Sequence, residues 1–309
     1  MRVADHLYWT GRYIKRAENT VKAVEGAYHT SLLRKDHAPE EWNNLLFMLG
    51  QRDHYLGLHA EFALDRLLHF MILDCANPAS LFSLIKSARE NGRSTWGTIS
   101  LDAWESLNSI WLDLNGWQRK KMDSAGDLVP LLTQIGEGVQ RFSGVLHNDL
   151  LHDDAFRIIG LGNALEKSDY LIRVVTSRFG AMTREPSKEK ACSDALALLR
   201  WIGATEIYQK IFRNVVSPRF VLELLVTRTD VRCSLYSSIE RMNRSLEPFS
   251  SGNGNRAAQM ATRLMIRTLE FRNDDLMRDS FLKRLRALAD ELDKLAGQIN
   301  AWFQGAACA

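Results

Sequence analysis

The chain has few of the features that mark disulfide-stabilised, zinc-binding or membrane proteins. No run of 18 or more apolar residues occurs, and no apolar signal-peptide core follows the N-terminus. We therefore expect neither a membrane span nor a signal peptide. Isolated cysteines without a Cys-x-x-Cys pair indicate reduced thiols of a cytoplasmic protein. The four cysteines are Cys75, Cys192, Cys233 and Cys308.

Charge of one sign is also scarce. The 40 basic and 37 acidic residues are interleaved along the chain, and the formal net charge is only +3. Proteins that bind nucleic acid without sequence preference usually carry a basic tail or block. DNA is therefore not expected as a partner, although a local anion site fits this balance.

Familiar catalytic and metal-binding motifs are absent from the sequence. It has no Walker A loop, no GxSxG and no HExxH, and the spacing of its histidines does not place two ligands on one helical face. Residues 160–168 imitate a glycine-rich phosphate loop, but no strand precedes them and a helix is favoured. We expect no metal and no cofactor bound by this chain. The eight tryptophans are interpreted mostly as core residues.

Proline is scarce, with six residues, and each stands where a helix could begin or end. Asn77-Pro78 and Ser217-Pro218 both have the pattern of an N-cap followed by a first helical residue. Between the prolines, apolar residues recur at intervals of three and four, and no alternating strand pattern occurs. The chain is predicted to be all-α. The recurring apolar positions are Leu45, Leu46, Leu49, Phe62, Leu64, Leu67, Leu68, Met71, Ile72, Leu276, Phe281, Leu282, Leu285, Leu288, Leu292, Leu295 and Ile299.

Three blocks of sequence suggest a weak internal duplication. The first places Gly11 on Gly162 and Glu18 on Asp169. A glycine inside a helix costs about 0.5–1 kcal/mol relative to alanine, so we interpret the glycine pair as a close approach between helices. The halves 1–150 and 151–309 are predicted to fuse into one helical bundle with pseudo-twofold symmetry. The matched blocks are 4–24 with 155–175, 45–50 with 198–203, and 77–85 with 217–225.

The opening helical segment carries more charge than solubility requires. Arg12 and Arg16 are four residues apart, so they share a helical face and repel by a few tenths of a kcal/mol. Lys15 adds to this cluster, and Glu18 offsets part of it. Planar guanidinium groups suit a carboxylate or a phosphate. The alternative is a merely solvated face of a helix whose packed side is Leu7, Ile14 and Val21.

A second charged segment contains Arg89 and Arg93, again four residues apart, with Glu90 beside them and two tryptophans nearby. The matching place in the second half begins at Thr229-Asp230, where the arginines are interpreted as lost. A charge needed for folding should be kept in both halves, so its loss in one half favours a functional role in the other. Drift is the alternative explanation.

Four stretches of the chain resemble, in order, the signatures of the alpha-E domain family of bacterial helical proteins. The family is named for a Glu-Arg pair in its opening helix. Here that pair reads Lys15-Arg16, the second copy reads Glu166-Lys167, and Asn163 stands where members usually have arginine. The four stretches are "ADHLYWTGRYIKRAENT", "NPASLFSLIKSARENGRSTWGTIS", "DDAFRIIGLGNALEKSDYLIRVV" and "SPRFVLELL".

The resemblance implies an association. Members lie beside, or are fused to, circularly permuted ATP-grasp proteins and transglutaminase-like proteins. ATP-grasp enzymes join a carboxylate to an amine through an acyl phosphate, so ATP and Mg²⁺ are expected on that partner. The residues carried over are Arg12, Arg16, Arg89 and Arg93 as substrate-binding, and Glu18 and Glu90 as catalytic.

Two kinds of function follow as hypotheses. The favoured one is a helical partner of an ATP-grasp amide or peptide ligase, accessory or co-catalytic, that binds a carboxylate-bearing substrate such as a peptide, an amino acid or aminoacyl-tRNA. The alternatives are a stand-alone acyl- or aminoacyl-transferring enzyme and a non-catalytic scaffold. Both site hypotheses require residues 12–18 and 89–93 to meet in one half-buried pocket.

Overall fold

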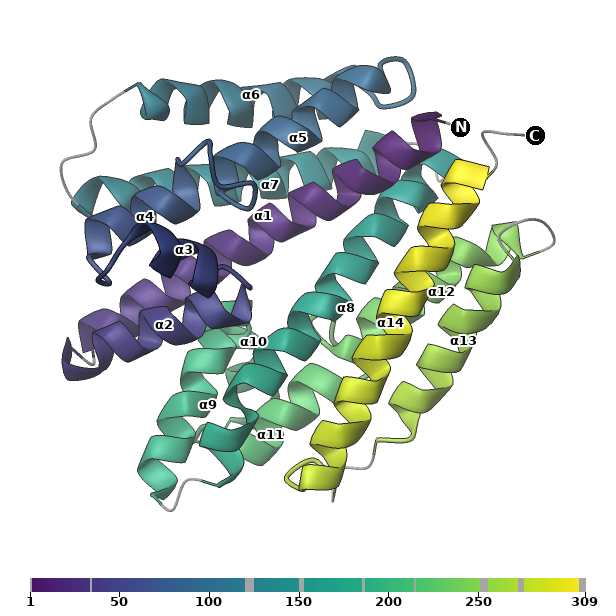
Figure 1. Ribbon diagram of the computed structural model, residues 1–309. Coiled ribbons are helices and arrows are strands. Elements are labelled where there is room, and N and C mark those ends of the chain that lie inside the picture. The colour runs from purple at the N-terminus through teal and green to yellow at the C-terminus, as the bar shows by residue number, and fades with distance from the viewer. Residues whose placement is uncertain are drawn as a thin grey trace. The chain divides into compact units, whose positions relative to one another are not determined.

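The computed structural model consists almost entirely of helices (Figure 1). Within the residues it describes, no β-strand forms, and an isolated bridge joins Trp96 and Ile99. The all-α prediction is confirmed. Cys308 lies outside the described residues, and the other three cysteines form no disulfide among the described residues. The described ranges are 2–33, 35–119, 125–149, 153–184, 187–213, 215–250, 255–271 and 275–305.

The chain folds as two compact units. The N-terminal unit comprises His6–Asn163, and the C-terminal unit comprises Met1–Asp5 together with Ala164–Ala309. The boundary after Asn163 falls inside the long helix α8 (Asp154–Thr183).

In the N-terminal unit, the helix α1 (Arg2–Leu33) begins the chain. Helix α5 (Leu81–Ser94) packs against α6 (Leu101–Gln118), which packs against α7 (Leu128–Asp149). Two of these helices have a serine N-cap. The side-chain hydroxyls of Ser80 and Ser100 accept hydrogen bonds from backbone N–H groups of the first turn of α5 and α6. The remaining elements are η1 (Lys35–His37), α2 (Ala38–Met48), α3 (Arg52–Leu58), α4 (Leu64–Ile72) and η2 (Ala125–Asp127).

The C-terminal unit contains the rest of α8 and the elements that follow it. Helix α12 (Leu235–Leu246) packs against α13 (Asn255–Leu269), and α13 packs against α14 (Asp279–Gly305). A π-helical turn, η3 (Glu223–Thr227), continues α11 (Pro218–Leu222). The others are α9 (Lys188–Ile202), α10 (Thr205–Phe212) and η4 (Glu247–Phe249).

One of the two predicted Pro helix starts is wrong. Pro78 lies in a turn, and α5 begins three residues later at Leu81. The side chain of Asn77 forms this turn instead of a cap, because its Oδ1 accepts the N–H of Ala79 at 3.0 Å and its Nδ2 donates to the carbonyl of Phe70 at 2.9 Å. The other start is confirmed, since Pro218 is the first residue of α11.

The predicted core positions are largely confirmed. Leu45 and Leu46 are buried, as are the predicted positions of α4 from Leu67 onward and the leucines of α14 from Leu285 onward. Leu276 and Phe281 are also buried. The partly buried exceptions are Leu49, Phe62, Leu64 and Leu282. The interpretation of most tryptophans as core is wrong. Trp42 and Trp201 are buried, but Trp96 is 62% exposed, and the others are partly exposed because they lie at the edges of helix faces. Across the described helices, no apolar stretch is long enough to span a bilayer.

Candidate functional site

Helix α1 has one apolar side and one charged side. Leu7, Ile14 and Val21 recur every seven residues and are buried, as the sequence predicted. The charged side chains at positions 12, 15, 16, 18 and 22 are only partly buried. Four of these five positions are basic, so α1 carries an excess of positive charge that is partly withdrawn from water.

Arg12 lies against aromatic rings of its own helix. Its guanidinium carbon is 5.8 Å from the centre of the Tyr8 ring and 5.2 Å from that of Trp9. Arg12 also donates to the Tyr8 hydroxyl at 3.4 Å. Such cation–π contacts are worth about 0.5–1 kcal/mol at exposed sites and restrict the guanidinium. Arg16, one turn further along, is partly buried.

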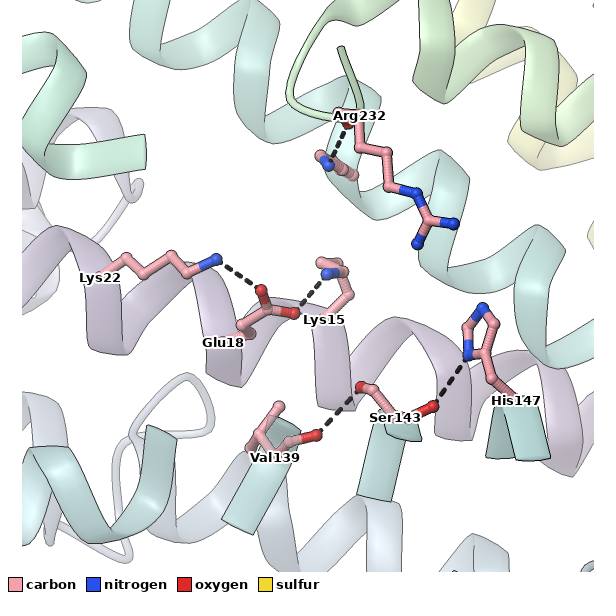
Figure 2. Close-up of polar contacts among 8 residues, drawn as sticks. Lys15, Glu18, Lys22, Val139, Ser143, His147 and Arg232 are labelled. Atoms are coloured by element: carbon pink, nitrogen blue, oxygen red, sulfur yellow. Dashed lines mark hydrogen bonds and ion pairs between the residues drawn. The ribbon is translucent and has the colours of Figure 1, made fainter. Parts of the chain in front are cut away.

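Glu18 is held between two lysines of α1. Figure 2 shows one carboxylate oxygen directed to Lys15 and the other to Lys22. The Lys22 ammonium lies 2.6 Å from Oε1 of Glu18, and the Lys15 ammonium pairs with Oε2. The Lys15 and Glu18 side chains are only 11% and 15% exposed, so the pair is shielded from solvent.

The two lysines keep Glu18 ionised. Burial alone raises the pKa of a carboxyl group, but the charges and hydrogen bonds of Lys15 and Lys22 outweigh it and lower the pKa of Glu18 from 4.5 to about 2. A carboxylate with so low a pKa is a weak base. Its arrangement therefore favours a role in fixing the two ammonium groups over accepting a proton from an amine.

On α5, Arg89, Glu90 and Arg93 form one ion-paired cluster. Arg89 Nη1 donates to Glu90 Oε1 at 2.8 Å, and Arg93 Nη2 lies 2.9 Å from Glu90 Oε2. The Arg89 Nε donates to Asn108 of α6 at 2.8 Å, and its guanidinium carbon lies 5.5 Å from the Trp104 ring centre. Arg89 is thus tied to α6, whereas Arg93 is 67% exposed and reaches solvent.

A hydrogen bond of 2.9 Å between Nδ1 of His6 and Oδ1 of Asn91 joins α1 to α5. Asn91 lies between Arg89 and Arg93, so the two helices meet beside the second charged segment. The acids have separate partners, because Glu18 pairs with lysines of α1 and Glu90 pairs with arginines of α5. Convergence of all six candidate side chains in one pocket stays a prediction.

The two glycines predicted to mark a helix contact do so. A methyl group on Gly11 would lie 2.2 Å from the carbonyl oxygen of Ile159, and one on Gly162 would lie 2.2 Å from that of Tyr8. Each glycine therefore faces the backbone three residues before the other. This crossing of α1 with α8 lies one residue before Arg12, and it places the backbone N–H of Arg12 at the contact.

Sequence reasoning missed several polar residues of this region. Asn108 had no signal, because it is an isolated amide whose role depends on α6 lying beside α5. Asn19 adjoins Glu18 and is 7% exposed, and its Nδ2 has no hydrogen-bond partner among the described residues. The described residues contain no cluster of three or more metal-ligating side chains of the His, Cys, Asp and Glu types.

These features define a helical protein with a charged first helix, and a family model accounts for nearly the whole chain. Residues 1–303 match Alpha-E, described as "a predicted alpha-helical domain with a conserved ER motif". The chain belongs to the Alpha-E family. No solved structure matches it.

Three curated mycobacterial proteins are similar to this chain. They are "Uncharacterized protein Mb2597" of Mycobacterium bovis and "Uncharacterized protein MT2643" and "Uncharacterized protein Rv2567" of Mycobacterium tuberculosis. Each is 24% identical over 271 residues, which cover 82% of this chain. The match spans only 30% of each relative's length, so this chain is similar to one part of those longer proteins.

Proposed function

We propose that this Alpha-E chain is the helical partner of an ATP-grasp amide or peptide ligase in the cytoplasm. It would hold a carboxylate-bearing, peptidic or aminoacyl substrate, while the ATP-grasp protein binds ATP and Mg²⁺ and forms the acyl phosphate. The observation that carries the proposal is the charge of α1: residues 12–22 contain four basic side chains and one acid, all partly buried. Grouped guanidinium and ammonium groups suit the carboxylate or phosphate group of a substrate.

The state of the two acids supports binding over chemistry by this chain alone. Glu18 is fixed between Lys15 and Lys22, and its low pKa makes it a poor general base at neutral pH. Glu90 is paired with two arginines. In this arrangement the acids orient basic groups, and the basic groups of both helices receive the substrate carboxylate.

The length of the relatives supports a partnership. In the mycobacterial proteins the matching region is 30% of a longer chain. That region is therefore joined to further protein sequence in the same polypeptide. In the proposed partnership, the ATP-grasp protein supplies nucleotide binding and formation of the acyl phosphate.

We further propose that the two halves arose by duplication, with pseudo-twofold symmetry. Gly11 and Gly162 make reciprocal contacts, which supports this proposal. The Glu18–Lys22 ion pair also has a counterpart at the matching positions, where Arg173 Nη2 lies 3.1 Å from Asp169 Oδ2.

Reconstitution with an ATP-grasp protein encoded beside this chain tests the function. We expect a complex that forms amide bonds, and we expect the double variant Arg12→Gln/Arg16→Gln to raise the KM for the carboxylate substrate roughly tenfold or more, since a hydrogen bond to a charged group is worth about 1.5–3 kcal/mol. Arg141→Gln is the matched control, because Arg141 is an exposed arginine of the same unit on α7.

The outcomes separate the hypotheses. Ligation at the normal rate without this chain, together with no complex, would exclude the partnership. Turnover by the purified chain alone, abolished by Glu18→Gln or Glu90→Gln, would instead favour a stand-alone transferase. A complex whose activity is insensitive to all these substitutions would leave the chain a scaffold.

A further inference from the structure

The C-terminal unit contains a polar cavity far along the sequence from the charged segments of α1 and α5. It lies where the loop after η3 leads into α12, and its volume is about 220 Å³. The side chains that matter for its chemistry come from Thr229, Asp230, Arg232, Ser237, Arg241 and Arg244.

One face of α12 forms a wall of this cavity. Ser237, Arg241 and Arg244 follow one another at intervals of four and three residues, so they lie on the same side of the helix. Ser234 caps α12 by accepting the N–H of Ser237 at 3.0 Å, and the Ser237 hydroxyl donates to the carbonyl of Thr229 at 3.4 Å. The loop is thereby attached to the positive end of the helix dipole.

The acids of the cavity are already paired with arginines. Asp230 receives two hydrogen bonds from Arg228, at 2.8 and 2.5 Å, and these bonds lower the pKa of Asp230. Glu240 pairs with Arg244 at 2.8 Å. Three arginines and two acids line the cavity, so its walls carry an excess of positive charge.

Arg232 is held by its backbone while its side chain extends. Its carbonyl accepts a hydrogen bond from the Lys167 ammonium at 2.6 Å, and Figure 2 shows the Arg232 guanidinium pointing away from that contact. The guanidinium has no ion pair within the part of the chain that the structure describes. Lys167 brings a further positive charge to the same loop.

We propose that this cavity binds a small oxyanion, the carboxylate or phosphate group of a ligand, between the guanidinium groups of Arg232 and Arg241. Ser237 holds the loop against the same wall, because its hydroxyl donates to the carbonyl of Thr229. Guanidinium groups bind such oxyanions through paired N–H donors, which makes arginine better suited to this site than lysine.

The loop has two arginines close to the places matched with Arg89 and Arg93. Those places are Thr229 and Cys233, and Arg228 and Arg232 each lie one residue before them. The two pairs differ in their contacts. Both Arg89 and Arg93 pair with Glu90, whereas Arg228 pairs with Asp230 and Arg232 extends alone.

Calorimetric titration of the full chain with inorganic phosphate and, separately, with acetylglycine tests the proposal at constant ionic strength. We expect Arg232→Gln to weaken binding roughly tenfold or more, and Arg232→Lys to restore part of it. Arg286→Gln is the matched control, because Arg286 is an exposed arginine of α14 in the same unit with no described ion pair.

The two titrations identify the ligand group, since binding of either ion supports the site and the tighter one names its chemistry. Absence of binding by both ions would overturn the proposal, as would an equal loss in Arg286→Gln and Arg232→Gln. Circular dichroism melting curves confirm that each variant is folded. Neither Arg12 nor Arg16 is altered, so failure here leaves the function proposed for α1 untouched.

Discussion

At the scale of single residues, neighbouring charges determine whether a shielded side chain such as Glu18 is ionised. Glu18 and Lys22 are one helical turn apart on α1, as are many surface pairs that contribute only about 0.3–0.5 kcal/mol. Glu18 differs because its side chain is only 15% exposed and is shared with Lys15. Its ionisation is therefore linked to the stability of the fold.

Stability should fall in acid through Glu18. Its pKa is about 2 in the folded chain and 4.5 ordinarily, so the unfolded chain binds the proton more readily. The contribution of the carboxylate is fully present above pH 4.5 and is lost as the pH falls towards 2. It amounts to on the order of 3 kcal/mol. Urea unfolding of wild type and Glu18→Gln should differ by up to this amount at pH 7 and converge near pH 2.

Glu137→Gln is the control for this measurement, because Glu137 is an exposed acid of α7 in the same unit. It should change stability by less than about 0.5 kcal/mol at either pH. A difference between wild type and Glu18→Gln that stays constant across the acidic range would contradict the assigned pKa.

A buried ion pair in the C-terminal unit was missed by sequence reasoning. Arg178 on α8 and Asp194 on α9 have side chains only 5% and 7% exposed, and their charged atoms are 3.3 Å apart. The Arg178 guanidinium also lies 4.4 Å from the Trp201 ring centre. Nothing in the sequence separated these two charges from surface residues, because their burial depends on how α8 and α9 pack.

Asp194→Asn should destabilise the chain by about 3–5 kcal/mol, because it removes the carboxylate that offsets a buried guanidinium. The free energy of unfolding in urea at neutral pH measures this effect. Asp279→Asn is the matched control: its pair with Arg184 in the same unit is 2.7 Å long, but both side chains are 65% exposed. That variant should lose less than about 1 kcal/mol. Equal losses would mean that burial of the Arg178 pair does not matter.

At the scale of elements, the crossing of α1 and α8 depends on two residues without side chains. Gly11 and Gly162 let the helices approach until a methyl group on either would lie 2.2 Å from a backbone carbonyl oxygen. Backbone atoms cannot rotate away as the end of a side chain can. The sequence predicted this contact because glycine is unfavourable inside a helix and recurs at matching positions.

Gly11→Ala should therefore destabilise the N-terminal unit by about 1–3 kcal/mol, as overpacking usually does, despite alanine's better helix propensity. Gly144→Ala in α7 is the control, because a methyl group there would meet nothing within 4 Å. It should stabilise the chain by up to about 1 kcal/mol. Thermal unfolding followed by circular dichroism gives both values. A stabilising Gly11→Ala would refute the close crossing.

Helix starts show how far local signals reach. Ser217-Pro218 begins a helix as predicted, but Asn77-Pro78 does not, because the Asn77 amide reaches the carbonyl of Phe70 in the preceding helix α4. The competing partner lies seven residues earlier in the chain and depends on the packing of α4. Local sequence therefore showed that helices begin near these prolines, but it did not identify the first residue of α5.

At the scale of the whole molecule, a nearly balanced charge is distributed unevenly. The net charge is +3, yet basic residues concentrate on the charged side of α1 and around the loop after η3. Membership of the Alpha-E family, shown over residues 1–303, is consistent with both units belonging to one family region.

The sequence by itself determined the all-α class, the family and the apolar faces of the helices, because helical periodicity and short signatures are local properties of the chain. It also located the charged segments on α1 and α5. Tertiary structure alone decided which charges are shielded. Arg178 and Asp194 pair between α8 and α9, and Lys15 and Glu18, although three residues apart on α1, are only 11% and 15% exposed. Burial raises the free-energy cost of an ionised side chain, and sequence periodicity does not show which charged side chains are buried.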